Sequence, residues 1–260
     1  MKAGEYELHS GYSMHAIAQK IAQGKVAKEF LTIPEGWNLG DIASYLESKE
    51  AFSEREFFEI AGSPAFDYRR IAPFPLPRDF SQEYEFLKDK PKTIGLEGYL
   101  FPDTYHMPKG SSIEDILRQM LDNFGRKFTP DLQEKATAQR KSIAEIVTMA
   151  SLIEKEVQTE QDKRIVSGIL WKRIEAGMPL QVDATIVYLT DKKTTRISLE
   201  ETQIDSPYNT YRYRGLPFGP IANPGLDSIK AALEPASSPY WYILVLSFNP
   251  NRRDNLQRNA

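Results

Sequence analysis

The segment from Ser142 to Gln158, SIAEIVTMASLIEKEVQ, constrains the fold more than any other because it predicts a buried helix with a defined start. Apolar residues recur in it at spacings of three and four, which aligns them along one helical stripe. They are Ile143, Ile146, Val147, Ala150, Ile153 and Val157. Ser142 and Glu145 have the spacing of a capping box, so the sequence also predicts where this helix begins.

Glu154 is the one carboxylate predicted on the largely apolar side of this helix. It follows Ala150 by four residues and Ser151 by three, so its side chain should project above small residues where a substrate could approach. Glu156 is expected on roughly the opposite side of the helix. A glutamate on a helix is more often a solvated surface residue, and this segment alone leaves that alternative open.

Composition limits the chemistry that such a site can use. The 260 residues include no cysteine, which excludes disulfides, thiolate metal ligands and a cysteine nucleophile. The three histidines, His9, His15 and His106, have no metal-ligand spacing, so we expect no metal, no cofactor and no Ser-His-Asp hydrolase. A net charge of −3 argues against nucleic acid as a partner. The carboxylates, hydroxyls, amides and tyrosines that remain suit sugars.

The first fifty residues contain an internal repeat with an offset of 25 residues. Gly11-Tyr12-Ser13-Met14 corresponds to Gly36-Trp37-Asn38-Leu39, and each copy predicts a short strand, a turn, an N-cap and an amphipathic helix. The strands are expected at 6–8 and 30–33. Two such units resemble LysM modules, which hold glycans containing N-acetylglucosamine. A packing domain without a ligand is the alternative.

The chain as a whole is predicted to have an α+β fold with three parts: a LysM-like domain at 1–50, an irregular linker or insertion at 51–93, and a mixed α/β catalytic domain at 94–260. Prolines interrupt the second part after a helix near 52–61. In the third part, helices are expected after Ser111 (capped with Glu114), from Pro130, at 162–176 and at 227–233, and a strand at 240–248. Residues 180–189 suit either a strand or a short helix capped by Asp183.

Four ordered motifs carry a resemblance to a known family. They are LEGYLFPDTY at 96–105, ASLIEKEV at 150–157, LQVDAT at 180–185 and SPYNTYRYRGLPFGPIANPG at 206–225. The last is a loop rich in Pro, Gly and Tyr, and ordered loops of that length are uncommon unless they are functional. At this spacing the motifs closely resemble the YceG-like family of endolytic murein transglycosylases, usually called MltG. The resemblance covers nearly the whole chain.

The resemblance implies a lytic cleavage of peptidoglycan between N-acetylmuramic acid and N-acetylglucosamine. The muramyl C6 hydroxyl attacks its own anomeric carbon and leaves a 1,6-anhydro end. The family's single catalytic glutamate maps onto Glu154, which would act as acid and then as base. Partial burial over Ala150 and Ile153 would raise its pKa, and Lys155 would oppose that if it approached the carboxylate.

The resemblance also assigns six substrate-binding residues, three beneath the glycan and three against N-acetyl groups and sugar faces. The first three are Gln181, Asp183 and Thr185, and the second three are Tyr208, Asn209 and Tyr211. Amide and phenol side chains suit such contacts because they combine hydrogen bonds with a flat apolar surface. For each residue, a packed or loop-stabilising role is the alternative.

The same resemblance implies partners and a location. The substrate would be nascent glycan strands, which the enzyme would limit or terminate beside peptidoglycan synthases (penicillin-binding proteins), on the extracytoplasmic side of the bacterial inner membrane. Family members usually begin with a membrane-spanning helix and end with a further His-containing motif. This chain shows neither, so its anchoring rests on the family alone and the completeness of its catalytic part stays open. Two rivals remain: a non-catalytic peptidoglycan-binding module, and a water-using muramidase with Asp183 as second carboxylate.

Overall fold

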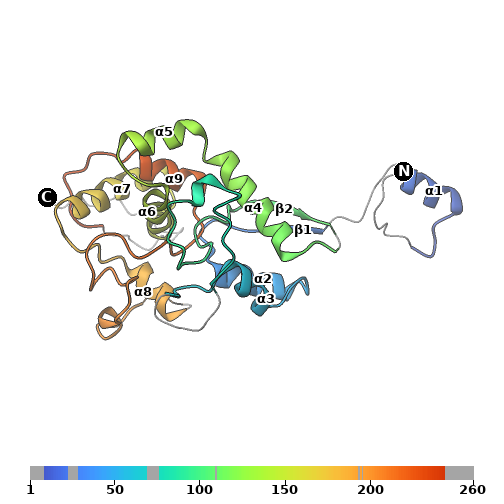
Figure 1. Cartoon of the computed structure of the whole chain (residues 1–260), viewed down its shortest axis with the longest axis horizontal. Helices are drawn as coiled ribbons and strands as arrows, with labels where there is room; N and C mark the ends of the chain where they lie inside the picture. The colour runs from blue at the N-terminus through green and yellow to red at the C-terminus, as the bar shows by residue number, and fades with distance from the viewer. Residues whose placement is uncertain are drawn as a thin grey trace, which may run out of the picture.

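The computed structural model describes residues 9–22, 29–68, 76–108, 110–192, 194 and 196–243. Helices dominate these residues, and two short strands form the sheet that accompanies them (Figure 1). The longer helices are α1 (Met14–Ala22), α2 (Leu39–Ser48), α3 (Glu54–Ala61), α4 (Ile113–Lys127), α5 (Pro130–Ala138), α6 (Ile143–Glu156), α7 (Glu160–Glu175), α8 (Asp183–Thr190) and α9 (Leu226–Leu233). The 3₁₀ turns η1 (Glu85–Leu87) and η2 (Glu201–Gln203) complete the helical elements. This composition agrees with an α+β fold.

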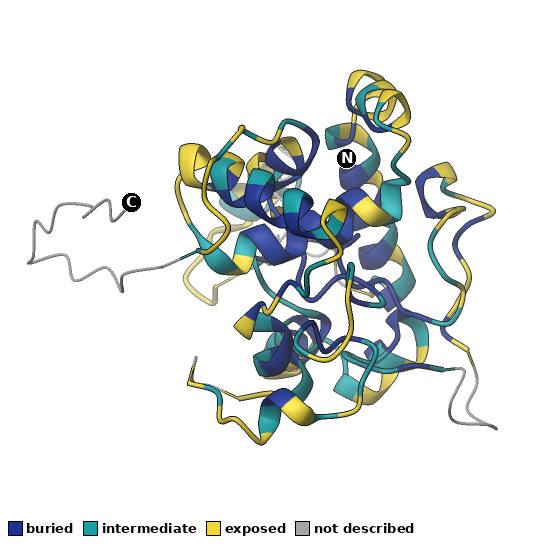
Figure 2. Ribbon diagram, turned by 90° about the vertical axis from the view of Figure 1, so that its left-hand side faces the viewer, coloured by how far each residue is buried: buried dark blue, intermediate teal, exposed yellow. Residues whose placement is uncertain are grey.

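Helix α6 lies at the centre of this arrangement, against α5, α7, α8 and α9 (Figure 1). Every residue from Ile146 to Ile153 is buried, including Thr148 and Ser151. The sequence predicted one apolar stripe, whereas the helix is enclosed on all sides over two turns, as expected of a helix inside a core. Buried segments run through the middle of the molecule and exposed residues lie on its outer faces (Figure 2).

The start of α6 is fixed twice. The Ser142 hydroxyl accepts from the Glu145 N–H, and the Glu145 carboxylate accepts from the Ser142 N–H, which confirms the predicted capping box. The Asp89 carboxylate also accepts from the Ile143 N–H at 2.7 Å. A carboxylate at a helix N-terminus satisfies free N–H groups and opposes the positive end of the helix dipole. The position of α6 therefore depends on the segment before it as well as on its own sequence.

The two predicted repeat units have different surroundings. Helices α1 and α2 are present, and Asn38 caps α2 as predicted. Strand β1 (Glu29–Thr32) pairs antiparallel with β2 (Thr104–Met107), which lies far along the chain. The strand expected at 6–8 lies outside the described residues. A LysM-like unit is not confirmed, and the domain division at 50 and 93 stays a prediction.

Several packing contacts join the three predicted parts. Buried side chains from Leu31 in β1 to Leu233 in α9 belong to one contiguous core. Phe57, Phe80 and Phe86, from the segment expected to be a linker, lie in that core. The helix predicted near 52–61 is α3, capped by Ser53. Whatever the domain boundaries are, residues 51–93 supply core side chains as well as the Asp89 cap.

Other local predictions are corrected in detail. The N-cap of α4 is Ser112, paired with Asp115, one residue later than the expected Ser111 and Glu114. The Ser112 hydroxyl accepts from the Asp115 N–H, and the Asp115 carboxylate accepts from the Ser112 N–H. Residues 183–190 form α8, so the helical alternative is confirmed there. Asp183 is its first residue rather than its cap, which is Val182.

The end of the described chain also differs from expectation. Residues 240–243 are not in a strand, and the remainder of the strand predicted at 240–248 lies outside the described residues. Helix α5 begins at Pro130, and α7 and α9 lie where helices were predicted. No helix among the described residues is long and apolar enough to cross a membrane.

Candidate active site

The predicted catalytic residue, Glu154, lies in the last turn of α6 with its carboxylate almost fully engaged. Its Oε2 accepts from the Ser228 hydroxyl at 2.6 Å and from the Gly225 N–H at 3.0 Å. The Lys163 ammonium lies 3.2 Å from the same oxygen and 3.3 Å from Oε1. Only 9% of the Glu154 side chain and 4% of the Lys163 side chain are exposed, so this is a buried ion pair. It joins α6, α7 and the start of α9.

Lys155, the cation expected to disturb Glu154, instead donates to the Gly36 carbonyl at 3.1 Å. Gly36 has φ +78° and lies in the turn between β1 and α2, a conformation that favours glycine. The same turn exchanges hydrogen bonds with Asn223: the Gly36 N–H donates to the Asn223 carbonyl, and the Asn223 N–H to the Trp37 carbonyl. The N-terminal part of the chain is thus attached beside Glu154.

Glu35, in this turn, lies close against Gly225. An added Cβ at Gly225 would lie 2.0 Å from a Glu35 carboxylate oxygen, so a side chain there would displace Glu35. Partial burial, followed by the nearby Glu154 carboxylate, raises the pKa of Glu35 above its ordinary value. A second carboxylate therefore borders the Glu154 side of α6.

The LEGYLFPDTY motif supplies Glu97, a buried carboxyl group that connects three segments. It accepts from the Leu39 N–H at 3.1 Å, from the Tyr188 hydroxyl at 3.0 Å and from the Asn223 side-chain amide at 3.3 Å. Burial raises its pKa to about 8. Asn223 also accepts from the Leu100 N–H. Glu97 thus holds the end of the 206–225 loop against α2 and α8.

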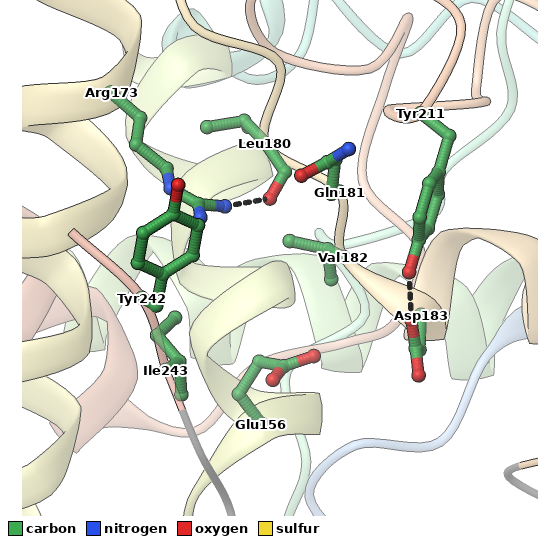
Figure 3. Close-up of a pocket in the computed structure, with 9 residues that line it drawn as sticks. All are labelled: Glu156, Arg173, Leu180, Gln181, Val182, Asp183, Tyr211, Tyr242 and Ile243. Carbon is green, nitrogen blue, oxygen red and sulfur yellow. Dashed lines mark hydrogen bonds between the residues drawn. The ribbon is translucent and has the colours of Figure 1, made fainter.

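A cavity of about 430 Å³ opens on the other side of the end of α6 (Figure 3). It is lined by Glu156, Arg173, Leu180, Gln181, Val182, Asp183, Tyr211, Tyr242 and Ile243. The sequence predicted that Glu156 points away from Glu154, and it does so, but toward this cavity rather than toward open solvent. The residues that line the cavity with Glu156 come from α7, α8, the loops at 180–182 and 206–225, and the segment after α9, which are distant from one another in sequence.

Glu156 differs from Glu154 in its contacts. Among the described residues, no side chain or N–H group makes a hydrogen bond or ion pair with its carboxyl group. Burial, followed by the nearby Asp183 carboxylate, raises the pKa of Glu156 to about 7. Such a group can hold a proton near neutral pH and release it, as general acid–base catalysis requires.

Three of the six predicted substrate-binding residues line this cavity: Gln181, Asp183 and Tyr211. The Tyr211 hydroxyl donates to the Asp183 carboxylate (Figure 3). Burial and this hydrogen bond raise the pKa of Tyr211. Gln181 has φ +50°, an uncommon conformation for a residue with a side chain, and its N–H donates to the Thr210 carbonyl. All three side chains are accessible from the cavity.

The other three, Thr185, Tyr208 and Asn209, are buried behind the cavity wall. The Thr185 hydroxyl donates to the Val182 carbonyl at 2.7 Å. The Asn209 amide donates to the carbonyls of Thr202 and Ile204, and its oxygen accepts from the Tyr211 N–H at 2.9 Å. Tyr208 packs edge-on against Phe218. These contacts fit the loop-stabilising alternative.

Among the cavity residues that sequence reasoning did not assign to a site are two charged residues, Glu156 and Arg173, and one tyrosine, Tyr242. The position of Glu156 two residues after Glu154 was visible, but nothing local showed which side of α6 would be covered. Arg173 and Tyr242 stood in segments taken as an ordinary helix and a strand. No group of three or more His, Cys, Asp or Glu side chains in the described part of the chain could hold a metal ion.

Comparisons with known proteins identify the family of this chain. Residues 1–252 match the YceG-like family. The chain is similar to the endolytic murein transglycosylase of Bacillus subtilis (strain 168), at 34% identity over 248 residues that cover 95% of this chain and 67% of that protein. It is 30% identical over 261 residues to the endolytic murein transglycosylase of Streptococcus pneumoniae serotype 2 (strain D39 / NCTC 7466), covering 94% of this chain and 46% of that protein.

A solved structure gives the same result. The 2.6 Å crystal structure of a putative yceG-like protein from Listeria monocytogenes matches with a TM-score of 0.71 at 32% identity, over 94% of this chain and 79% of that one. The chain therefore belongs to the YceG-like family.

Proposed function

We propose that this protein is an endolytic lytic transglycosylase that cleaves peptidoglycan between N-acetylmuramic acid and N-acetylglucosamine. The names of the relatives support peptidoglycan as the substrate class. The observation that carries the mechanism is Glu156, a cavity carboxyl group whose pKa is raised to about 7 beside Asp183, Gln181 and Tyr211. We propose Glu156 for the catalytic role in place of Glu154, because the Glu154 carboxylate is already occupied by three donors.

In this mechanism one carboxyl group serves twice. Protonated Glu156 gives its proton to the glycosidic oxygen, and the bond from that oxygen to the muramyl anomeric carbon breaks. The C6 hydroxyl of the same sugar forms the new bond to the anomeric carbon, and ionised Glu156 takes the hydroxyl proton. The product ends in 1,6-anhydromuramic acid, and no water is consumed. Gln181, Asp183 and Tyr211 would hold the glycan at the cavity.

A water-using muramidase is a second candidate, because Asp183 lies in the same cavity as Glu156. Ordinary glycosidases use two carboxyl groups about 5 to 9.5 Å apart. In that reaction Asp183 would act as nucleophile or base. Water would then add to the muramyl anomeric carbon and give a reducing end. The two candidates share the acid and differ in the product.

Peptidoglycan digested in ¹⁸O-labelled water and analysed by mass spectrometry separates these candidates. We expect internal fragments with unlabelled 1,6-anhydromuramyl ends, and no such fragments from Glu156→Gln. Reducing ends that carry ¹⁸O would overturn the lytic reaction in favour of the muramidase. Binding of glycan without cleavage by the wild-type chain would instead favour a peptidoglycan-binding module.

The wider role that we propose follows the family resemblance. The enzyme would limit or terminate nascent glycan strands beside peptidoglycan synthases, on the extracytoplasmic side of the bacterial inner membrane. Cleavage inside strands, rather than from their ends, is supported by the names of the relatives.

A further inference from the structure

Arg173 brings a positive charge into the wall of the same cavity. It lies in α7, only 5% of the residue is exposed, and it lines the cavity with Glu156 and Asp183. In Figure 3, Arg173 and Tyr242 lie on one side of the cavity and Asp183 with Tyr211 on the other. The cavity therefore carries a cation in one wall and the Asp183 carboxylate in the wall opposite, and Glu156 lies between them in this view.

The contacts of Arg173 leave its charge without an anion. Its Nη1 donates to the Leu180 carbonyl at 2.6 Å and its Nε to the Trp241 carbonyl at 2.7 Å. The guanidinium carbon lies 5.0 Å from the centre of the Tyr242 ring. No carboxylate among the described residues pairs with Arg173, and its Nη2 has no partner there. Burying a charge without a counter-charge is costly, so such groups usually have a partner.

The free part of the guanidinium is accessible to a ligand. In the described part of the chain, the buried side-chain atoms that lack any partner are the Tyr99 hydroxyl and the Ser167 hydroxyl, so Nη2 is not sealed inside the protein. A guanidinium held at two of its nitrogens by backbone carbonyls is fixed in orientation and suits a carboxylate oxygen.

We infer that Arg173 is a specificity-determining residue that binds a carboxylate of the substrate. This rests on the proposed function, which makes murein the substrate. The sugars of a murein strand are uncharged, and their N-acetyl groups need no cation. The carboxylates of intact murein belong to the peptide attached at the lactyl ether of muramic acid, and removing that peptide frees the lactyl carboxylate itself. The shared chemistry is a carboxylate attached at the muramyl lactyl group.

The test measures binding, so that it does not depend on cleavage. Three soluble murein fragments are titrated against Glu156→Gln: strands with peptides, the same strands with their peptide carboxylates converted to amides, and strands stripped of peptides. We expect amidation to weaken binding about tenfold or more, as for loss of a charge-assisted hydrogen bond. Adding Arg173→Gln should remove this preference. Adding Arg173→Lys, which keeps the charge, should retain part of it.

The stripped strands identify the source of the carboxylate. Tight, Arg173-dependent binding of stripped strands assigns it to the lactyl group, whereas binding as weak as that of amidated strands assigns it to the peptide. Lys172→Gln is the matched control. Lys172 donates to the Ser238 and Tyr240 carbonyls, so this change loosens the same chain segment without altering the charge in the cavity. It should keep the tenfold preference.

A preference for the carboxylate that persists after Arg173→Gln would overturn the inference. Equal binding of the peptide-bearing and the amidated strands by Glu156→Gln alone would also overturn it. The ratio of two dissociation constants within one variant does not depend on how much of it is folded. If the wild-type chain cleaves nothing but keeps the Arg173-dependent preference, the proposed reaction is wrong and the carboxylate site stands. If the wild-type chain cleaves peptidoglycan but shows no preference for the carboxylate-bearing strands, the proposed reaction stands and the carboxylate site is wrong.

Discussion

Glu154 and Glu156 leave the last turn of α6 on opposite sides and meet different surroundings. On one side, Lys163, Ser228 and the Gly225 N–H surround Glu154 in a buried ion pair. On the other, Glu156 lines a cavity and has no hydrogen-bond or ion-pair partner within the described residues. Only Lys155 separates the two glutamates in the sequence. One carboxylate nevertheless joins three helices, whereas the other is free to contact a ligand in the cavity.

This difference shows what makes a carboxyl group suitable for proton transfer. A carboxylate with several donors is held in one position by its hydrogen bonds, which suits a structural role. A carboxyl group that is partly buried without donors is kept near the balance of its two protonation states. Burial alone does not distinguish the two roles, because both residues are shielded from solvent. The donors do.

The largest expected effect on stability comes from breaking the Glu154 ion pair. Lys163→Met should lower the free energy of unfolding by about 3–5 kcal/mol, because it leaves a buried carboxylate without its counter-charge. Urea unfolding measures this. Lys155→Met is the control, since the exposed Lys155 donates only to the Gly36 carbonyl, and it should cost less than about 1 kcal/mol. Equal stability of Lys163→Met and the wild type would contradict the structural role of the pair.

A smaller effect of opposite sign is expected on the Glu156 side. The pKa of Glu156 is raised to about 7 in the folded protein, so its ionisation favours unfolding, and this cost grows as pH rises from its ordinary pKa to about 7. The stability of Glu156→Gln relative to the wild type should therefore increase by about 2 kcal/mol between pH 5 and pH 8. Urea unfolding at both pH values checks the sign. No change with pH would mean that Glu156 is not shielded in the folded state.

The smallest expected effect concerns a single donor to Glu154. Ser228→Ala removes the 2.6 Å hydrogen bond to Oε2 and should lower the free energy of unfolding by about 1–2 kcal/mol, while Lys163 and Gly225 keep their contacts. Thermal unfolding is sufficient to measure it, with the exposed Ser237→Ala as control. If Ser228→Ala reduced cleavage as strongly as Glu156→Gln, the separation of the two sides would be wrong.

Local sequence signals predicted much of the fold. The Ser142–Glu145 capping box, the Asn38 and Ser53 caps and Pro130 at the start of α5 each depend on residues within one turn, so spacing alone located them. The pairing of β1 with β2 could not be predicted in this way. It joins residues 29–32 to 104–107, and a repeat pattern says nothing about a partner so far along the chain.

The candidate site was predicted only in part, because some of its contacts also join residues that are distant in the sequence. Gln181, Asp183 and Tyr211 were found from motifs and do line the cavity. Our proposal of Glu156 in place of Glu154 depends on which side of α6 meets Lys163 of α7 and Ser228 of α9, and no local pattern contains that information. The buried position of Asn209 likewise follows from loop contacts that form only in the folded chain.

The central claim is that Glu156 performs the chemistry and Glu154 holds the helix end. The most direct test is to compare Glu154→Gln with Glu156→Gln in one assay of peptidoglycan cleavage, alongside their unfolding free energies. We predict that Glu156→Gln lowers the cleavage rate by about 10²-fold or more while remaining folded at pH 8. Glu154→Gln should lose stability and keep most of the cleavage rate of its folded fraction. A stable Glu154→Gln that cannot cleave, beside an active Glu156→Gln, would contradict the claim and return the catalytic role to Glu154.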